Sequence, residues 1–181
     1  MFVNDAFGTS HRAHASNVGI AKNIAHSCIG FLVQKELEAL SKLTNSPKRP
    51  FVVILGGAKV SDKLKVIESL LKSADHILIG GGMVNTFNMA KGYNIGKSLY
   101  EPEMLDTAKK ILADDKTNKI ILATDQMVTK ASTITDIKTA PAGKCVFAKD
   151  ETADEDFEAL DIGVKSIETF KTYIAKAKSI F

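Results

Sequence analysis

The chain of 181 residues is 45% hydrophobic and 25% charged, which is typical of a folded globular protein and excludes an intrinsically disordered one. Its 24 Lys and Arg residues exceed its 21 Asp and Glu residues by only three, too few to predict binding to nucleic acid or to an anionic membrane. Any anion must therefore be bound by a local group of residues.

The cysteines and the hydropathy pattern predict the compartment. Cys28 and Cys145 form neither a CxxC motif nor a Cys/His metal spacing, so we expect thiols in a reducing compartment rather than a disulfide. No apolar run approaches the ~20 residues of a membrane span, and the first residues lack a basic-then-apolar signal pattern. We expect a cytoplasmic protein that is neither exported nor anchored.

The first 46 residues predict one helix after an irregular segment. The stretch from Phe2 to Gly30 has no sustained periodicity, which is typical of a short strand that continues as loop. Val33, Leu37 and Leu40 then recur at i, i+4 and i+7. This spacing predicts an amphipathic helix from about Phe31 to Leu43.

From Pro50 onward, apolar runs of strand length alternate with helical periods. The runs do not alternate with polar residues, as expected of parallel strands covered on both faces. They are Phe51–Leu55, Ile77–Ile79 and Ile120–Ala123. Helical spacing predicts helices over 64–71 and, after Pro102, over 105–112. Together these elements predict an α/β fold with a doubly wound, Rossmann-like parallel sheet and helices on both faces.

The last third of the chain is mixed. Short strands are expected around Ile134, Ile137, Val146 and Phe147. The acidic run from Asp150 to Glu158 is expected to be a solvated face. A helix near Ser166–Ala177 is followed by Lys178–Phe181, which has the pattern of a further strand. Such a strand would continue into a ligand-binding loop, so we expect the chain to be part of a longer protein.

The segment from Leu55 to Lys63 follows the first predicted strand and opens the first helix. Its glycines let the backbone approach a ligand, Ser61 can cap the helix, and free N–H groups at a helix start attract anions. A cation in the first turn is disfavoured by up to ~1 kcal/mol, and a bound phosphate would reverse that effect. Lys59 and Lys63 are therefore candidate phosphate ligands. The alternative is an ordinary tight turn with two solvated lysines.

A second glycine turn, Gly80–Met83, follows the next strand and precedes a short helix that carries Val84 and Phe87. Because the carboxyl ends of parallel strands meet at one edge of a sheet, we expect both turns at the same edge. The dinucleotide fingerprint G-x-G-x-x-G is not completed, since Asn85 stands where the third glycine belongs. A nicotinamide-dependent dehydrogenase is disfavoured.

Another apparent phosphate motif, Gly92–Ser98, ends in Gly-Lys-Ser. It has three residues between its glycines instead of four, and it follows a predicted helix rather than a strand. We do not expect a P-loop there. Leu160–Gly163 has the pattern of an acidic-glycine turn ahead of a helix, and this pattern alone does not indicate a functional site.

The segment from Asn4 to His14 contains candidate ligands. His11 and His14 have no third metal ligand nearby in the sequence, so a hydrogen-bonded or surface histidine pair is expected rather than a metal site. Arg12 stands among small residues, where its guanidinium suits bidentate binding of phosphate or carboxylate.

Six segments, taken together and in order, resemble phosphoglycerate kinases from Val3 to the last residue. They are VNDAFGTSHRAHAS, GFLVQKELEAL, RPFVVILGGAKVSDK, ILIGGGMVNTF, IGKSL and LDIG. The resemblance implies glycolytic phosphoryl transfer between 1,3-bisphosphoglycerate with ADP and 3-phosphoglycerate with ATP, with magnesium on the nucleotide. It also implies a complete enzyme that is monomeric.

The resemblance implies roles for particular residues. Arg12 would bind phosphoglycerate and, with Lys59 and Lys63, act in catalysis. The nucleotide would be held by Gly57, Ala58, Lys59, Lys63, Gly82, Ala159 and Leu160. Ala159 stands where the family usually has glycine, and Val164 where it usually has proline.

By resemblance, residues 1–30 are the end of the phosphoglycerate-binding domain, residues 31–46 the interdomain helix, and residues 47–181 the first part of the nucleotide-binding domain. The magnesium-site residues of the family lie in segments that this chain does not contain, so no metal ligand is assigned. We expect the chain alone to be inactive. A non-catalytic remnant that only binds adenine nucleotide is the alternative.

Overall fold

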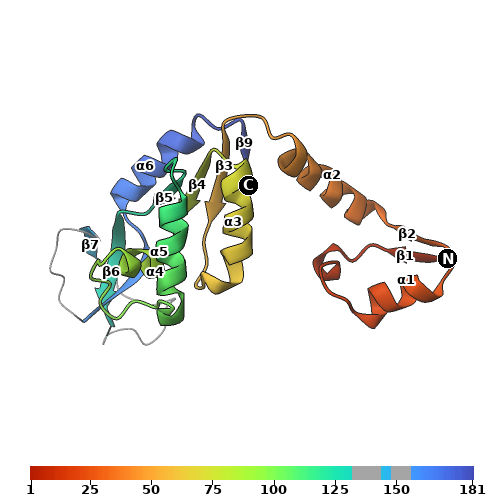
Figure 1. Cartoon of the computed structure of the whole chain (residues 1–181), viewed down its shortest axis with the longest axis horizontal. Coiled ribbons are helices and arrows are strands. Elements are labelled where there is room, and N and C mark those ends of the chain that lie inside the picture. Colours follow the sequence, from red (N-terminus) through yellow and green to blue (C-terminus); the bar gives the residue numbers. More distant parts are fainter. Residues whose placement is uncertain (132–143, 148–155) are drawn as a thin grey trace. The chain divides into compact units, whose positions relative to one another are not determined.

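The computed structural model describes residues 1–131, the backbone of residues 144–147, and residues 156–181 (Figure 1). The chain forms two compact units, Met1–Pro47 and Lys48–Phe181. Within the described residues, we find no helix that combines the length and the hydropathy needed to cross a bilayer.

The first unit pairs two short parallel strands and ends in a long helix. Its elements are β1 (Phe2–Asn4), helical turns at Phe7–Thr9 and Ala15–Gly19, α1 (Ile20–Asn23), β2 (Ser27–Ile29) and α2 (Phe31–Asn45). The predicted short strand and the predicted helix are confirmed, and α2 extends two residues beyond the expected end. The expected loop is wrong in part, because it contains helical turns and a second strand.

A carboxylate near the start of the chain holds the first turn of α2. Asp5 Oδ1 accepts the Val33 N–H at 3.0 Å, and a Cβ on Gly30 would lie 2.3 Å from Asp5 Cγ. Only glycine leaves room for this approach. Val33 is buried, whereas Leu37 is 45% exposed, so the apolar stripe of α2 is only partly covered within this unit.

The second unit contains a four-stranded parallel sheet in the order β5-β4-β3-β9. Its strands are β3 (Phe51–Leu55), β4 (His76–Ile79), β5 (Ile120–Leu122) and β9 (Ser179–Ile180). The predicted strands and the doubly wound fold are confirmed. The chain moves outward from β3 to β5 and then returns to the opposite side of β3 at β9. The topological switch point, where such sheets bind ligands, therefore lies between β3 and β9.

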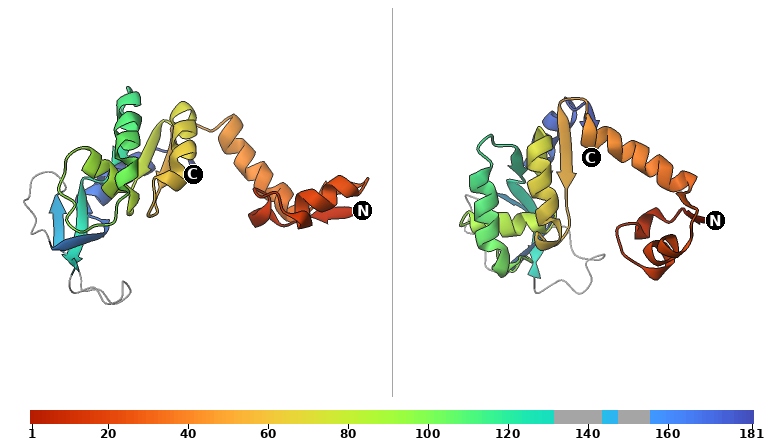
Figure 2. Two further views of the ribbon diagram at one scale, coloured as in Figure 1. Left: turned by 60° about the horizontal axis from the view of Figure 1, so that its bottom comes forward. Right: turned by 45° about the vertical axis from the view of Figure 1, so that its right-hand side comes forward.

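Helices connect these strands, and Figures 1 and 2 show them around the sheet. They are α3 (Leu64–Ser73), α4 (Met83–Ala90), α5 (Leu105–Asp114) and α6 (Val164–Ile174). Right-handed crossovers place α3, α4 and α5 on one face of the sheet and α6 on the other. The central strands are largely buried, as expected. Ile54 in β3 is an exception at 44% exposure, so that face of the sheet is not fully covered at this position.

A second, antiparallel sheet in the order β7-β6-β8 was not expected in this form. Its strands are β6 (Asp125–Lys130), β7 (Lys144–Phe147) and β8 (Phe157–Ile162). The predicted strand at Val146 and Phe147 is confirmed as β7. The turn predicted for Leu160–Gly163 is wrong, because β8 continues to Ile162 and Gly163 is the N-cap of α6. The expectations for Ile134, Ile137 and most of the acidic run lie outside the described residues.

Candidate functional site

The two glycine turns are in direct backbone contact at the carboxyl edge of the parallel sheet. The Gly57 carbonyl accepts the Met83 N–H at 2.8 Å. A Cβ on Gly81 would lie 2.9 Å from the Gly57 nitrogen, and one on Gly82 would lie 3.3 Å from Ala58 Cα. The expectation that both turns lie at the same edge is confirmed.

The first turn is open on its outer side. Gly57 has φ +120°, in the region that favours glycine, and a Cβ on Gly56 or Gly57 would meet nothing within 4 Å. The turn directly follows β3, beside the topological switch point. A ligand could therefore approach the Gly56–Gly57 backbone from this side.

Lys59 and Lys63 follow this open turn, and both side chains are exposed. Neither ammonium group forms a hydrogen bond or ion pair with another residue in the part of the chain that the structure describes. Lys63 ends the 3-10 turn Ser61–Lys63 and is the N-cap residue of α3. Two cations beside an open glycine turn form an arrangement suited to a polyphosphate.

The backbone N–H groups between the two lysines already bind a carboxylate. Glu101 Oε2 accepts the N–H of Val60 at 2.5 Å and that of Ser61 at 3.1 Å, and Glu101 Oε1 accepts the Ser61 hydroxyl at 2.5 Å. The expected capping of the helix by Ser61 is therefore wrong, since its hydroxyl points to Glu101 instead. The carboxylate fills the position that the sequence pattern assigned to a bound anion.

Glu101 is ionised in this setting although its side chain is buried. Burial acts to raise its pKa, but hydrogen bonds from Ser61 and Val60 and the charge of Lys59 outweigh burial and lower the pKa below its ordinary value. Its own N–H donates to Thr86 Oγ at 3.1 Å, which links it to α4. Glu101 was not predicted as a site residue, and the one sequence signal for it is its position just before the predicted helix start.

Ala159 and Leu160 lie in β8, whose end reaches the second glycine turn. The Ala159 N–H donates to Ser98 Oγ at 2.9 Å. A Cβ on Gly80 would lie 3.1 Å from Ile162 Cγ2. The described contacts therefore link Ile162, rather than Ala159 or Leu160, directly to the turn.

The Gly92–Ser98 segment follows α4 and binds β8. Lys97 forms an ion pair with Asp156 at 2.8 Å, and its N–H donates to the Phe157 carbonyl at 2.8 Å. A Cβ on Gly96 would lie 2.6 Å from the Phe157 ring, so the backbone packs closely there. The hydrogen bond and charge of Asp156 raise the Lys97 pKa. This arrangement agrees with the prediction that the segment is not a P-loop.

Arg12 lies in the first unit, where its backbone is held in place. Asn17 is buried, and its Nδ2 donates to the carbonyls of Arg12 at 2.8 Å and Thr9 at 3.0 Å. Arg12 Nε donates to His11 Nε2 at 3.1 Å. Among the residues described, its two terminal guanidinium nitrogens have no protein partner, so they are available for an anion.

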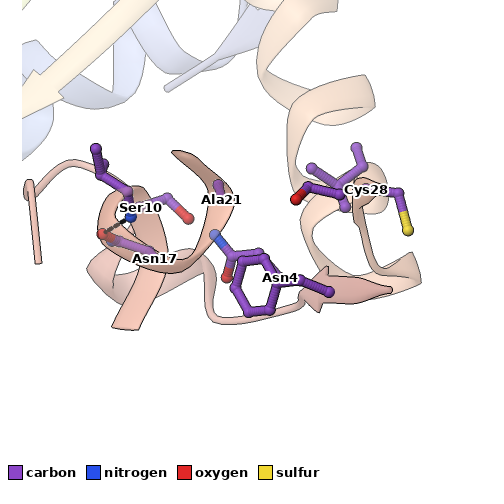
Figure 3. Close-up of a pocket in the computed structure, with 9 residues that line it drawn as sticks. Asn4, Ser10, Asn17, Ala21 and Cys28 are labelled. Atoms are coloured by element: carbon purple, nitrogen blue, oxygen red, sulfur yellow. Dashed lines mark hydrogen bonds between the residues drawn. The ribbon is translucent and has the colours of Figure 1, made fainter. Parts of the chain in front are cut away.

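The first unit also contains a hollow of about 310 Å³. Figure 3 shows Asn4, Asn17 and Cys28 in its wall, with Cys28 as an exposed free thiol. Arg12 does not line this hollow.

No cluster of three His, Cys, Asp or Glu side chains suited to a metal ion occurs in residues 1–131 or 156–181. His11 makes its hydrogen bond with Arg12 instead.

The comparisons with known proteins agree in one family. The family model described as phosphoglycerate kinase matches residues 1–181. The phosphoglycerate kinase of Mycoplasmoides gallisepticum is 89% identical over all of this chain, which spans 44% of that protein. That of Mycoplasma pneumoniae is 54% identical, again over all of this chain and 43% of the relative.

Solved structures give the same result. The phosphoglycerate kinase of Coxiella burnetii superposes with a TM-score of 0.85 at 37% identity, over 99% of this chain and 45% of that one. The enzyme of Pyrococcus horikoshii gives 0.77 at 34% identity, over 98% of this chain and 44% of that one. The chain thus spans less than half the length of the relatives it matches. Because the family model covers every residue, the chain belongs to the phosphoglycerate kinase family.

Proposed function

We propose that this chain is part of a phosphoglycerate kinase and that Lys48–Phe181 carries part of its adenine-nucleotide site. The reaction would transfer a phosphoryl group between 1,3-bisphosphoglycerate with ADP and 3-phosphoglycerate with ATP. The observation that carries this proposal is the contact between Gly57 and Met83 at the switch point. Beside the turn lie two lysines whose ammonium groups have no hydrogen-bond or ion-pair partner among the described residues.

Lys59 and Lys63 would hold the phosphates of the nucleotide. Their ammonium groups are exposed and follow a turn whose outer side is open at Gly57. The absence of side chains at Gly57 and Gly82, with only a methyl group at Ala58, lets the nucleotide lie against the backbone. Each lysine would gain a charge-assisted hydrogen bond to phosphate.

Ala159 and Leu160 would lie beside the adenosine. The approach of Ile162 to Gly80 supports this assignment, since it places the end of β8 next to the second glycine turn. The family usually has glycine at the position of Ala159, whose side chain packs here against Val128 and Phe157.

Arg12 would bind phosphoglycerate. With Lys59 and Lys63, it would help to neutralise the charge of the phosphoryl group during transfer. Phosphoryl transfer depends on positioning and on positive charge around the transferring oxygens, with little covalent chemistry from the protein. Two observations support this role: the terminal guanidinium nitrogens of Arg12 have no partner among the described residues, and Asn17 anchors the Arg12 backbone.

Magnesium would accompany the nucleotide and help to neutralise its phosphates. The described residues offer no ligand cluster for it, so we assign none.

We further propose that residues 1–30 end the phosphoglycerate-binding domain, that residues 31–46 form the interdomain helix, and that residues 47–181 begin the nucleotide-binding domain. The complete enzyme would be cytoplasmic and monomeric, without nucleic-acid or membrane partners.

The proposal is tested by titrating ADP into the parent chain and two variants in a calorimeter. Removing a charge-assisted contact costs ~1.5 to 3 kcal/mol, so Lys63→Ala should weaken ADP binding at least about tenfold. The matched control is Lys97→Ala, which removes a lysine that pairs with Asp156 instead. It should leave ADP affinity close to that of the parent.

Circular dichroism on the same samples should show that both variants fold. A greater loss of ADP affinity in Lys97→Ala than in Lys63→Ala would contradict the proposal, because the phosphates would then bind at a different turn from the one proposed. Independently, a coupled assay on this chain alone should show no phosphoglycerate kinase turnover.

A further inference from the structure

Glu101 is a buried carboxylate that the proposed nucleotide site does not use directly. It is 8% exposed and lies 40 residues beyond Ser61 in the sequence, yet its two oxygens accept three hydrogen bonds from Val60 and Ser61. Its N–H is bound by Thr86 in α4. It therefore connects the start of α3 to the helix that follows the second glycine turn.

We propose that Glu101 is a positioning residue of the nucleotide site: its carboxylate fills the backbone anion position at Val60 and Ser61 and fixes the loop that presents Lys59 and Lys63. This inference rests on the proposed function, because it assumes that the two lysines hold the phosphates.

The loop from Gly57 to Lys63 is held at two points in the described structure. Its first residue is bound through the Gly57 carbonyl to Met83 N–H, and its middle is bound through Val60 and Ser61 to Glu101. Lys59 lies between these points and Lys63 follows the second. Without Glu101 the Val60 side chain would still be buried, but the N–H groups of Val60 and Ser61 would lose their acceptor. A nucleotide would then have to order this part of the loop on binding.

Filling the anion position has a second consequence. The N–H groups of Val60 and Ser61 are the donors that a helix start would otherwise offer to phosphate. Since Glu101 accepts both, the phosphates must be bound by the ammonium groups and by the backbone nearer Gly57. The site then depends on where the lysines are held.

A carboxylate close to Lys59 also repels phosphate, and removing its charge would favour binding. Three donors compensate the charge of Glu101, so its field on a neighbouring ligand is reduced. The described hydrogen bonds to Glu101 tie Val60 and Ser61 to a residue distant in the sequence, whereas the Val60 carbonyl accepts only the nearby Lys63 N–H within the loop. We therefore expect positioning to outweigh repulsion.

The test compares Glu101→Gln and Ser61→Ala with a matched control, Glu103→Gln. Glu103 is an exposed acid two residues further along the chain. ADP and adenosine are titrated into each protein, by calorimetry for ADP and by NMR shift perturbation for adenosine. Glu101→Gln and Ser61→Ala should bind ADP about three- to tenfold more weakly, with adenosine affinity unchanged. Glu103→Gln should match the parent.

Amide exchange reports the loop itself. The Val60 N–H should exchange faster in Glu101→Gln than in the parent, and at the parent rate in Glu103→Gln. If Glu101→Gln does not fold, Ser61→Ala carries the test, since it removes one donor to Glu101 from an exposed residue and leaves the carboxylate in place.

The outcomes separate the two proposals. Equal or tighter ADP binding in Glu101→Gln would overturn the positioning role, provided that Lys63→Ala still weakens binding. An equal loss of ADP and adenosine affinity would show a merely structural role and would also overturn it. If the parent binds no ADP, or if Lys63→Ala has no effect, the proposed nucleotide site fails and this inference fails with it.

Discussion

The buried carboxylate of Asp125 binds Ser166 at the first turn of α6. Asp125 Oδ1 accepts both the Ser166 N–H, at 2.7 Å, and the Ser166 hydroxyl, at 2.5 Å. Its second oxygen accepts the Lys165 N–H at 3.0 Å. Asp125 is fully buried and begins β6, so one carboxylate joins the antiparallel sheet to the helix that leads into β9.

We expect this junction to contribute strongly to stability. Asp125→Asn replaces one acceptor oxygen by a donor that faces N–H groups, and it should lower the free energy of unfolding by about 1.5 to 3 kcal/mol. Ser166→Ala should lower it by about 1 kcal/mol. The control Asp114→Asn, at the exposed end of α5, should stay within about 0.5 kcal/mol of the parent. Denaturant unfolding measures all three, and equal values for Asp125→Asn and Asp114→Asn would contradict this account.

The contact between the glycine turns gives a second prediction. Gly81 has φ +64°, and a Cβ there would lie 2.9 Å from the Gly57 nitrogen, whereas Gly92 has φ +81° with nothing within 4 Å. Both Gly81→Ala and Gly92→Ala carry backbone strain of ~1 to 3 kcal/mol. Only Gly81→Ala also pushes the two turns apart.

Gly81→Ala should therefore unfold at a lower denaturant concentration than Gly92→Ala and should also bind ADP more weakly. Gly92→Ala should lose stability but retain the ADP affinity of the parent. The same calorimetric titration decides this. Parent-like ADP binding by a folded Gly81→Ala protein would show that the contact between the turns does not matter for the site.

The sequence was most informative where strands are buried on both faces. Phe51–Leu55 and Ile77–Ile79 are continuous apolar runs, and runs of this kind identify the strands of a parallel sheet without any knowledge of their partners. The strands β6 and β8 read DQMVTK and FEALDI, in which polar and apolar residues are mixed. Their pairing depends on partners distant in the sequence, so no local pattern predicted them.

The same distinction applies to the site. The glycine turns and their lysines are local features, and strand order alone predicts that the turns share one edge. Glu101 and Asp125 act on residues about 40 positions away, at Ser61 and Ser166. A single acidic residue in a sequence does not indicate which N–H groups it will meet, so these contacts required the structure.

Stability at acid pH gives the last prediction. Burial acts to raise the Glu101 pKa, but its hydrogen bonds from Ser61 and Val60 prevail, so the folded pKa lies below the ordinary value of 4.5. Such a group contributes stability that is complete above its unfolded pKa and is lost as the pH falls through its folded pKa. The parent should therefore exceed Glu101→Gln in unfolding free energy by a constant amount at neutral pH, and this difference should shrink below about pH 4.5.

Other acids also affect the curves, which is why the comparison uses a difference. Asp75 has a lowered pKa as well, because hydrogen bonds from Phe51 and Arg49 outweigh the burial that acts to raise it. The contribution of Asp75 to the free energy of unfolding decreases as the pH is lowered, in the parent and in Glu101→Gln alike. It therefore cancels in the difference between the two proteins. Urea unfolding of both proteins and of Glu103→Gln, at intervals from pH 7 to about pH 3, measures the difference. Glu103→Gln should follow the parent throughout. A gap between parent and Glu101→Gln that stays constant or widens on acidification would mean that the Glu101 carboxylate is not held in its charged form by Val60 and Ser61.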